Sequence, residues 1–167
     1  TPGFTYSQSQ ACKDLRNLLE HSNTGNPVQF GQLVNKIPPN SSGGESRVYT
    51  LFGYLLNQNY DRFLIEGKRF EGEVLNTSDA FIIHLSNILR TEYYRLNGQV
   101  PQAKSSGSKA LAHGKKYNNP LWQAQGLRAM AEVYASNQIQ DSAFYFSDKA
   151  IQYAKRTAMD IETAQCF

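Results

Sequence analysis

Histidine and cysteine are the residue types in this sequence best suited to catalysis or metal binding, and their spacing favours neither. The histidines His21, His84 and His113 lie in different stretches of the chain, and Cys12 and Cys166 lie near its opposite ends. The sequence contains no Gly-rich phosphate loop, HExxH, Cys-x-x-Cys or Gly-x-Ser-x-Gly motif. We therefore expect a protein without catalytic residues, metal or cofactor. His84, which is flanked by aliphatic residues, is interpreted as a partly buried imidazole with satisfied hydrogen bonds.

Basic residues are the second set that could bind a ligand. The net charge is +3 over 167 residues, well below the Lys and Arg density of dedicated nucleic-acid-binding proteins. A basic stripe could still bind nucleic acid or acidic lipid. We prefer the alternative that these residues interact favourably with helix dipoles and keep the surface soluble. The residues concerned are Lys104, Lys109, Lys115, Lys116, Lys149, Lys155 and Arg156.

The hydrophobic residues indicate a soluble globular chain. They make up 40% of the sequence, which is enough to bury a continuous core without disulfides or metal. The longest apolar stretch, residues 80–83, is far shorter than the roughly 18 to 20 residues that cross a bilayer. Residues 1–10 have no charged start followed by an apolar run, so any secretion signal has been removed or never existed.

A four-residue pattern, Tyr-x-x-Asn, indicates an internal repeat. It occurs three times at a spacing of forty residues, and several other positions match at the same offset. Periods of this length are typical of stacked helical hairpins. The residues of the pattern are Tyr54 and Asn57, Tyr94 and Asn97, and Tyr134 and Asn137.

Hydrophobic periodicity predicts two helices in each of the later repeats. In the second repeat the expected helices cover about residues 78–96 and 101–116, with a turn at 97–99. In the third, a helix begins at Pro120, where a first-turn proline is tolerated, and a second helix ends near Arg156. We expect an all-α fold of stacked antiparallel helical hairpins.

The expected organisation places three hairpin repeats after an atypical N-terminal part. A further helix is expected to start at Asp160, by analogy with Pro120, and the chain stops within it, which suggests a piece of a larger protein. Residues 1–44 are expected to form a helical cap and a loop, with helices at about 9–21 and 27–37 and the loop at 38–44. The three repeats cover about residues 45–77, 78–117 and 118–157.

Small residues recur where the two helices of a hairpin would cross. Ala143 and Ala150 follow Tyr134 at separations that resemble the signature of the tetratricopeptide repeat family. Ala103 and Ala110 follow Tyr94 in the same way, and helices approach closely only where side chains are small. The resemblance covers about residues 45–167. It departs from the family in its longer period, and in Asn87 and Arg90 where Trp and Leu are expected.

The resemblance implies an α-α superhelix whose concave face is lined by the first helix of each repeat. Mixed charge on such a face would suit an extended peptide or a partner helix. In the alternative interpretation, these charges only pair with one another across neighbouring hairpins, each pair contributing a few tenths of a kcal/mol. The groove positions carried over from the family are Phe52, Ile88, Glu92, Arg95, Arg128 and Glu132.

The resemblance further implies a protein- or peptide-binding scaffold. Similar arrays serve as sensory or docking segments of bacterial regulators, including sensor histidine kinases, which would place the chain in the bacterial cytoplasm or periplasm. The main alternative is a nucleic-acid-binding regulator that uses the basic second helices and binds with steep salt dependence. An enzyme would need clustered titratable groups, which the sequence does not place together. The partner and the oligomeric state stay open.

Overall fold

The computed structural model describes residues 10, 12–19, 27–37, 44–73 and 75–165, and the side chains as far as Thr157. These residues form helices and short turns without a strand, which confirms the all-α class. Within the same ranges, no helix combines the length and the apolarity needed to cross a bilayer. Residues 12–19 are helical, and they are followed by α2 (Pro27–Val34), α3 (Gly44–Leu56), α4 (Tyr60–Glu71), α5 (Ala80–Leu96), α6 (Val100–Lys116), α7 (Pro120–Ser136) and α8 (Gln140–Gln165).

The chain forms two compact units, Thr1–Ser78 and Asp79–Phe167. In the first unit α2 packs against α3, and α3 packs against α4. Its core consists of large apolar side chains that are almost fully buried. Residues of the N-terminal part predicted to form a cap belong to this core together with residues of the first repeat: Leu15, Phe30, Tyr49, Phe63 and Phe70.

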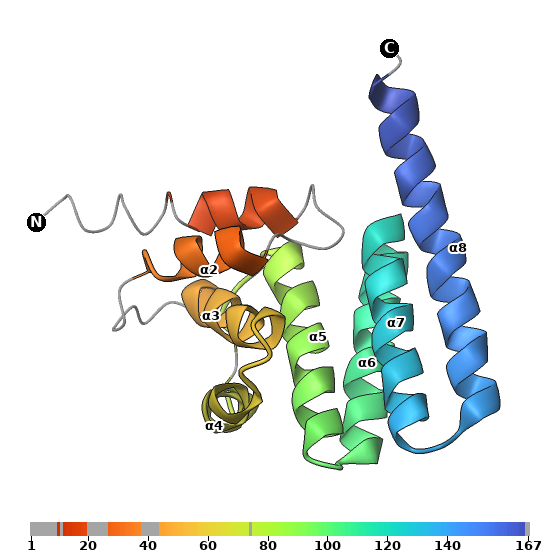
Figure 1. Cartoon of the computed structure of the whole chain (residues 1–167), viewed down its shortest axis with the longest axis horizontal. Helices are drawn as coiled ribbons and strands as arrows, with labels where there is room; N and C mark the ends of the chain where they lie inside the picture. Colours follow the sequence, from red (N-terminus) through yellow and green to blue (C-terminus); the bar gives the residue numbers. More distant parts are fainter. Residues whose placement is uncertain (1–9, 11, 20–26, 38–43, 74, 166–167) are drawn as a thin grey trace, which may run out of the picture. The chain divides into compact units, whose positions relative to one another are not determined.

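The second unit contains the helices α5 to α8, which run alternately up and down (Figure 1). Each of these helices packs against the next one along the chain, and α5 also contacts α7. The antiparallel hairpins predicted from the sequence are therefore present. Because α7 contacts α5, α6 and α8, it is the central helix of this unit.

The helices of the second unit begin at Ala80, Val100, Pro120 and Gln140, which is one helix every twenty residues. The first three helices are each 17 residues long. One residue in each connecting turn has a left-handed backbone conformation, with φ of 69° at Gly98, 47° at Asn118 and 58° at Gln138. Such a residue ends a helix by turning the chain away from the helix axis.

The asparagines of the Tyr-x-x-Asn pattern have the same role in both units. The side-chain Nδ2 of Asn57, Asn97 and Asn137 donates a hydrogen bond to the carbonyl four residues earlier, at 2.8, 3.0 and 2.7 Å. The tyrosine carbonyl of each pattern accepts a hydrogen bond from the N–H five residues later. The repeated pattern therefore builds the same helix ending three times.

Glycines allow α6 and α7 to approach each other more closely than alanine would. A Cβ at Gly114 would lie 2.8 Å from the backbone nitrogen of Gln123, and a Cβ at Gly126 would lie 2.8 Å from the Cα of Leu111. These distances are shorter than real Cβ contacts, so the backbones would have to separate. The sequence analysis named alanines but not these glycines. The alanines Ala103 and Ala110 are fully buried, whereas Ala143 and Ala150 are half-buried.

The last helix differs from the expectation. A separate helix was expected to start at Asp160, but α8 continues without a break through Gln165. The turn before α7 consists of Tyr117, Asn118 and Asn119, followed by Pro120, and the residues forty positions later are Thr, Ala, Met and Asp. The left-handed asparagine, the capping asparagine and the proline are thus absent at the later position, and nothing there stops the helix.

Candidate functional site

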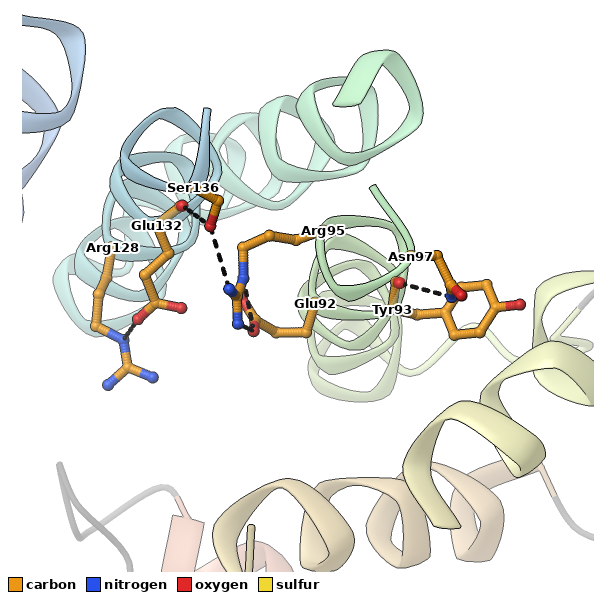
Figure 2. Close-up of polar contacts among 7 residues, drawn as sticks. All are labelled: Glu92, Tyr93, Arg95, Asn97, Arg128, Glu132 and Ser136. Carbon is orange, nitrogen blue, oxygen red and sulfur yellow. Dashed lines mark hydrogen bonds and ion pairs between the residues drawn. The ribbon is translucent and has the colours of Figure 1, made fainter. Parts of the chain in front are cut away.

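Five of the six predicted groove residues lie on the neighbouring helices α5 and α7 of the second unit. Ile88, Glu92 and Arg95 follow one face of α5, because they are four and three residues apart. Arg128 and Glu132 lie on α7, and Figure 2 shows their side chains on the same side of the two helices as Glu92 and Arg95. The sixth residue, Phe52, belongs to α3 of the first unit, where its ring lies 5.7 Å from that of Phe30. The site is therefore built from α5 and α7 alone.

Arg95 connects the two helices. Its Nη2 and Nε atoms donate to the same carboxylate oxygen of Glu92, at 2.7 and 3.1 Å. Its Nη1 atom reaches across to α7 and donates to the hydroxyl of Ser136 at 3.2 Å. That hydroxyl donates in turn to the backbone carbonyl of Glu132 at 2.8 Å (Figure 2). Arg95 and Glu92 are only 22% and 12% exposed, so this contact is shielded from solvent.

A second ion pair lies beside the first on α7. Arg128 contacts Glu132 with an Nε–Oε1 distance of 3.3 Å. The Arg128 side chain is 75% exposed, and its two terminal nitrogens point away from this contact in Figure 2. Because the contact uses Nε, most of the donor groups of this guanidinium face solvent.

The carboxyl group of Glu92 affects the protonation of Glu132. The pKa of Glu132 is raised from 4.5 to about 7, mainly by burial and further by the charge of Glu92 and a hydrogen bond with it, against the opposing effect of Arg128 and Arg95. Two neighbouring carboxylates cannot both ionise without a cost, so Glu132 keeps its proton to a higher pH than an isolated carboxyl group does. Near neutral pH both the protonated and the ionised form of Glu132 are therefore present.

The predicted alternative, in which these charges only pair with one another, describes part of the arrangement. The pairs form mainly within each helix, between Glu92 and Arg95 and between Arg128 and Glu132. Ser136 was not predicted, although it lies four residues after Glu132 and therefore on the same helical face. Arg128 and Glu132 keep 75% and 39% of their side-chain surface exposed, which leaves both accessible to a ligand.

Four of the seven basic residues predicted on the second helices lie near aromatic rings of the chain. Lys104 lies 4.5 Å from the ring centroid of Tyr134, and Arg156 lies 5.1 Å from that of Tyr153. Lys116 and Lys149 lie over tyrosine rings at 5.5 and 5.9 Å. Exposed cation–π contacts of this kind are weakly stabilising. They give these four cations a contact within the fold.

The tyrosines of the repeated pattern have different ring contacts. The ring of Tyr134 stacks on Phe146 of α8 at 5.3 Å and closes the contact between α7 and α8. Forty and eighty residues before Phe146 the sequence has Ser106 and Glu66, so no aromatic partner exists at the equivalent place for Tyr94 or Tyr54. The three tyrosines thus share the backbone hydrogen bond of the turn but not the ring contact.

Two histidines that are far apart in the sequence lie together in the core of the second unit. The ring of the fully buried His84 stacks on Trp122 at 5.0 Å, and His113 lies 5.8 Å from the same indole. The Nε2 of His84 lies 2.9 Å from the side-chain oxygen of Gln125, while its Nδ1 has no partner within hydrogen-bonding geometry. Burial lowers the pKa of His84 to about 4, and the nearby His113 contributes to the decrease. His84 is therefore neutral and more buried than expected.

Among the described side chains, neither the histidines His84 and His113 nor the carboxyl groups form a metal centre. Among the residues with described side chains, no three His, Cys, Asp or Glu side chains are arranged to hold a metal ion. Comparisons with models of protein families, with curated proteins and with solved structures gave no match. The interpretation of the site therefore depends on its own geometry.

Proposed function

We propose that the chain is a protein-binding module that holds a peptide or protein segment on the surface formed by α5 and α7. The observation that carries the proposal is the convergence of two arginines and two carboxyl groups from two neighbouring helices. Arg95 is held by Glu92 and Ser136 and so gives this surface a fixed geometry. A surface whose polar groups are fixed beforehand binds at a lower entropic cost.

The chemistry of the surface suits a ligand with both acidic and hydrogen-bonding groups. The exposed guanidinium of Arg128 can bind a carboxylate through two parallel hydrogen bonds. Glu132 can donate to a carbonyl when it is protonated and accept from an amide when it is ionised, because its pKa is raised to about 7. Ile88, one helical turn from Glu92, adds partly exposed apolar surface. An extended peptide or a partner helix presents all of these groups.

Two features support the assignment to a repeat array of the tetratricopeptide type. Identical helix endings recur at Asn57, Asn97 and Asn137, and the first helices of successive hairpins, α5 and α7, contact each other. In such arrays, the surface formed by successive first helices is the one that binds ligands. A role as the docking segment of a bacterial regulator is part of the same proposal. We propose binding rather than catalysis, because Arg128 and Glu132 keep 75% and 39% of their side-chain surface exposed.

The proposal can be tested with peptides selected against the immobilised chain from a random-peptide phage library. The selected peptides are then titrated calorimetrically into the wild-type chain and into the charge-reversal variants Arg128→Glu and Glu132→Lys. We expect each variant to lower the affinity on the order of tenfold or more, because each reverses a charge that would contact the ligand.

The matched control is Lys109→Glu, which reverses an exposed charge on α6 and should leave the affinity unchanged. Circular dichroism spectra that match the wild type would establish that all three variants are folded. Weaker binding by the Lys109 variant, with the two α7 variants unaffected, would contradict the proposal and favour the basic second helices as the binding surface.

A further inference from the structure

The outer face of α8 carries an exposed stripe in which apolar and charged residues alternate. Phe144, Asp148, Ile151 and Lys155 are separated by four, three and four residues, so they lie along one side of the helix. All four are exposed, and the two apolar residues are large, with Phe144 69% and Ile151 52% accessible. Exposed large apolar side chains in line on one helix face are typical of an interaction surface.

The equivalent helix of the preceding repeat, α6, can be compared with α8 position by position. In α6, the residue equivalent to Ile151 is Leu111, whose backbone lies against Gly126 of α7. In α8, by contrast, the only described helix in contact is α7. In Figure 1, this neighbour lies on one side of α8. At Ile151, α8 thus exposes a position at which α6 packs against a helix, whereas Ser108 and Lys115, the α6 equivalents of Asp148 and Lys155, are exposed as well.

We propose that this stripe binds the same stripe of a second copy of the chain, with the two α8 helices antiparallel about a two-fold axis next to Ile151. In this arrangement Ile151 of each copy faces Ile151 of the other. Asp148 lies three residues before Ile151 and Lys155 lies four residues after it. Measured along the paired helices, Asp148 of one copy and Lys155 of the other are therefore offset by only about 1.5 Å, the rise of one residue. Each Asp148 thus faces a Lys155 of the other copy.

The alternation of charge is what selects a second copy as the partner. A two-fold axis brings the same patch of both molecules together, so the patch must be complementary to itself when reversed. The order acidic, apolar, basic around Ile151 meets this condition, because reversal about Ile151 places Asp148 opposite Lys155. Charges beside an apolar seam set the orientation of paired helices. A parallel pair would instead place Asp148 beside Asp148 and Lys155 beside Lys155.

The oligomeric state of the 167-residue chain tests the proposal by sedimentation equilibrium over a range of micromolar concentrations. We expect a reversible monomer–dimer equilibrium for the wild type. Ile151→Asp should raise the dissociation constant on the order of tenfold or more, because it places two carboxylates at the centre of the contact. Ile65→Asp is the matched control, since Ile65 is an isoleucine on α4 that is 60% exposed, and it should leave the dissociation constant unchanged.

The charged pair tests the antiparallel orientation separately. Asp148→Lys and Lys155→Asp should each weaken the dimer, since each places like charges opposite one another. The double variant Asp148→Lys with Lys155→Asp restores opposite charges and should recover the wild-type dissociation constant. A wild-type chain that stays monomeric throughout the range would overturn the proposal, as would equal weakening by Ile65→Asp. A double variant no stronger than either single one would overturn the antiparallel pairing.

Discussion

Replacing Glu132 by glutamine should stabilise the second unit at alkaline pH more than at acidic pH. Burial and Glu92 raise the pKa of this carboxyl from 4.5 to about 7. The folded state therefore binds the proton more tightly than the unfolded state, and the wild type loses stability as the pH rises from about 4.5 to 7. Glutamine resembles the protonated acid, can still donate a hydrogen bond to Glu92 and does not titrate, so the variant avoids this loss.

The size of the effect follows from the pKa and the exposure of the side chain. For a fully buried group, a change from 4.5 to about 7 would correspond to about 3 kcal/mol. Because 39% of the Glu132 side chain is exposed, solvent screens much of the interaction, and we expect about 1 kcal/mol. The free energy of unfolding of Glu132→Gln, relative to that of the wild type, should therefore increase by about 1 kcal/mol between pH 5 and pH 8.

Urea unfolding at the two pH values measures this difference. The only tryptophan of the chain, Trp122, is buried in α7, so its fluorescence reports on the unit that contains Glu132. Asp141→Asn is a suitable control, because it removes an exposed carboxylate from α8 in the same unit. A stability difference between Glu132→Gln and wild type that is constant from pH 5 to pH 8, or that shrinks, would refute the reasoning.

Three further predictions concern the packing of the second unit. The free energy of unfolding of the wild type should fall by up to about 3 kcal/mol as the pH falls from 6.5 to about 4, because the buried His84 resists protonation. His84→Phe should remove this pH dependence in the same urea assay. A variant with the pH profile of the wild type would contradict this role of His84. Gly114→Ala should destabilise by about 1 to 3 kcal/mol, because its Cβ would meet the backbone of Gln123; a thermal melt like that of the wild type would contradict this close approach. Gly98→Ala should lower the stability of the second unit and Gln138→Gly should raise it, each by about 0.5 to 1 kcal/mol in thermal melts. The reason is that both positions have positive φ, which glycine adopts more easily than other residues. Effects of the opposite sign would exclude the left-handed turns.

The sequence was sufficient to predict the helical hairpins because the information lies in short, local patterns. The Tyr-x-x-Asn pattern marks a helix ending, and three such endings have the same side-chain hydrogen bond at Asn57, Asn97 and Asn137. The continuation of α8 was missed because the repeat offset was applied to residues after Arg156 that lack the turn residues of the earlier repeat. A period predicts a turn only where the residues that make the turn recur.

Contacts between helices were harder to predict than the helices themselves. Periodicity put Glu92 and Arg95 on one face of α5 and Arg128 and Glu132 on one face of α7. The effect of Glu92 on the pKa of Glu132 depends on the distance between two helices, which no spacing along the chain reveals. The same reason explains why the stack of two histidines on Trp122 was not predicted.

The surface formed by α5 and α7 is tested most directly by mapping a bound peptide by NMR. A peptide selected against the chain is added to the ¹⁵N-labelled protein, and the amide shifts of each residue are followed. We expect the largest changes at Ile88, Glu92, Arg128 and Glu132, with small changes at the exposed Lys109 of α6. Changes concentrated on α6 and α8, with α5 and α7 unaffected, would contradict the proposed binding surface.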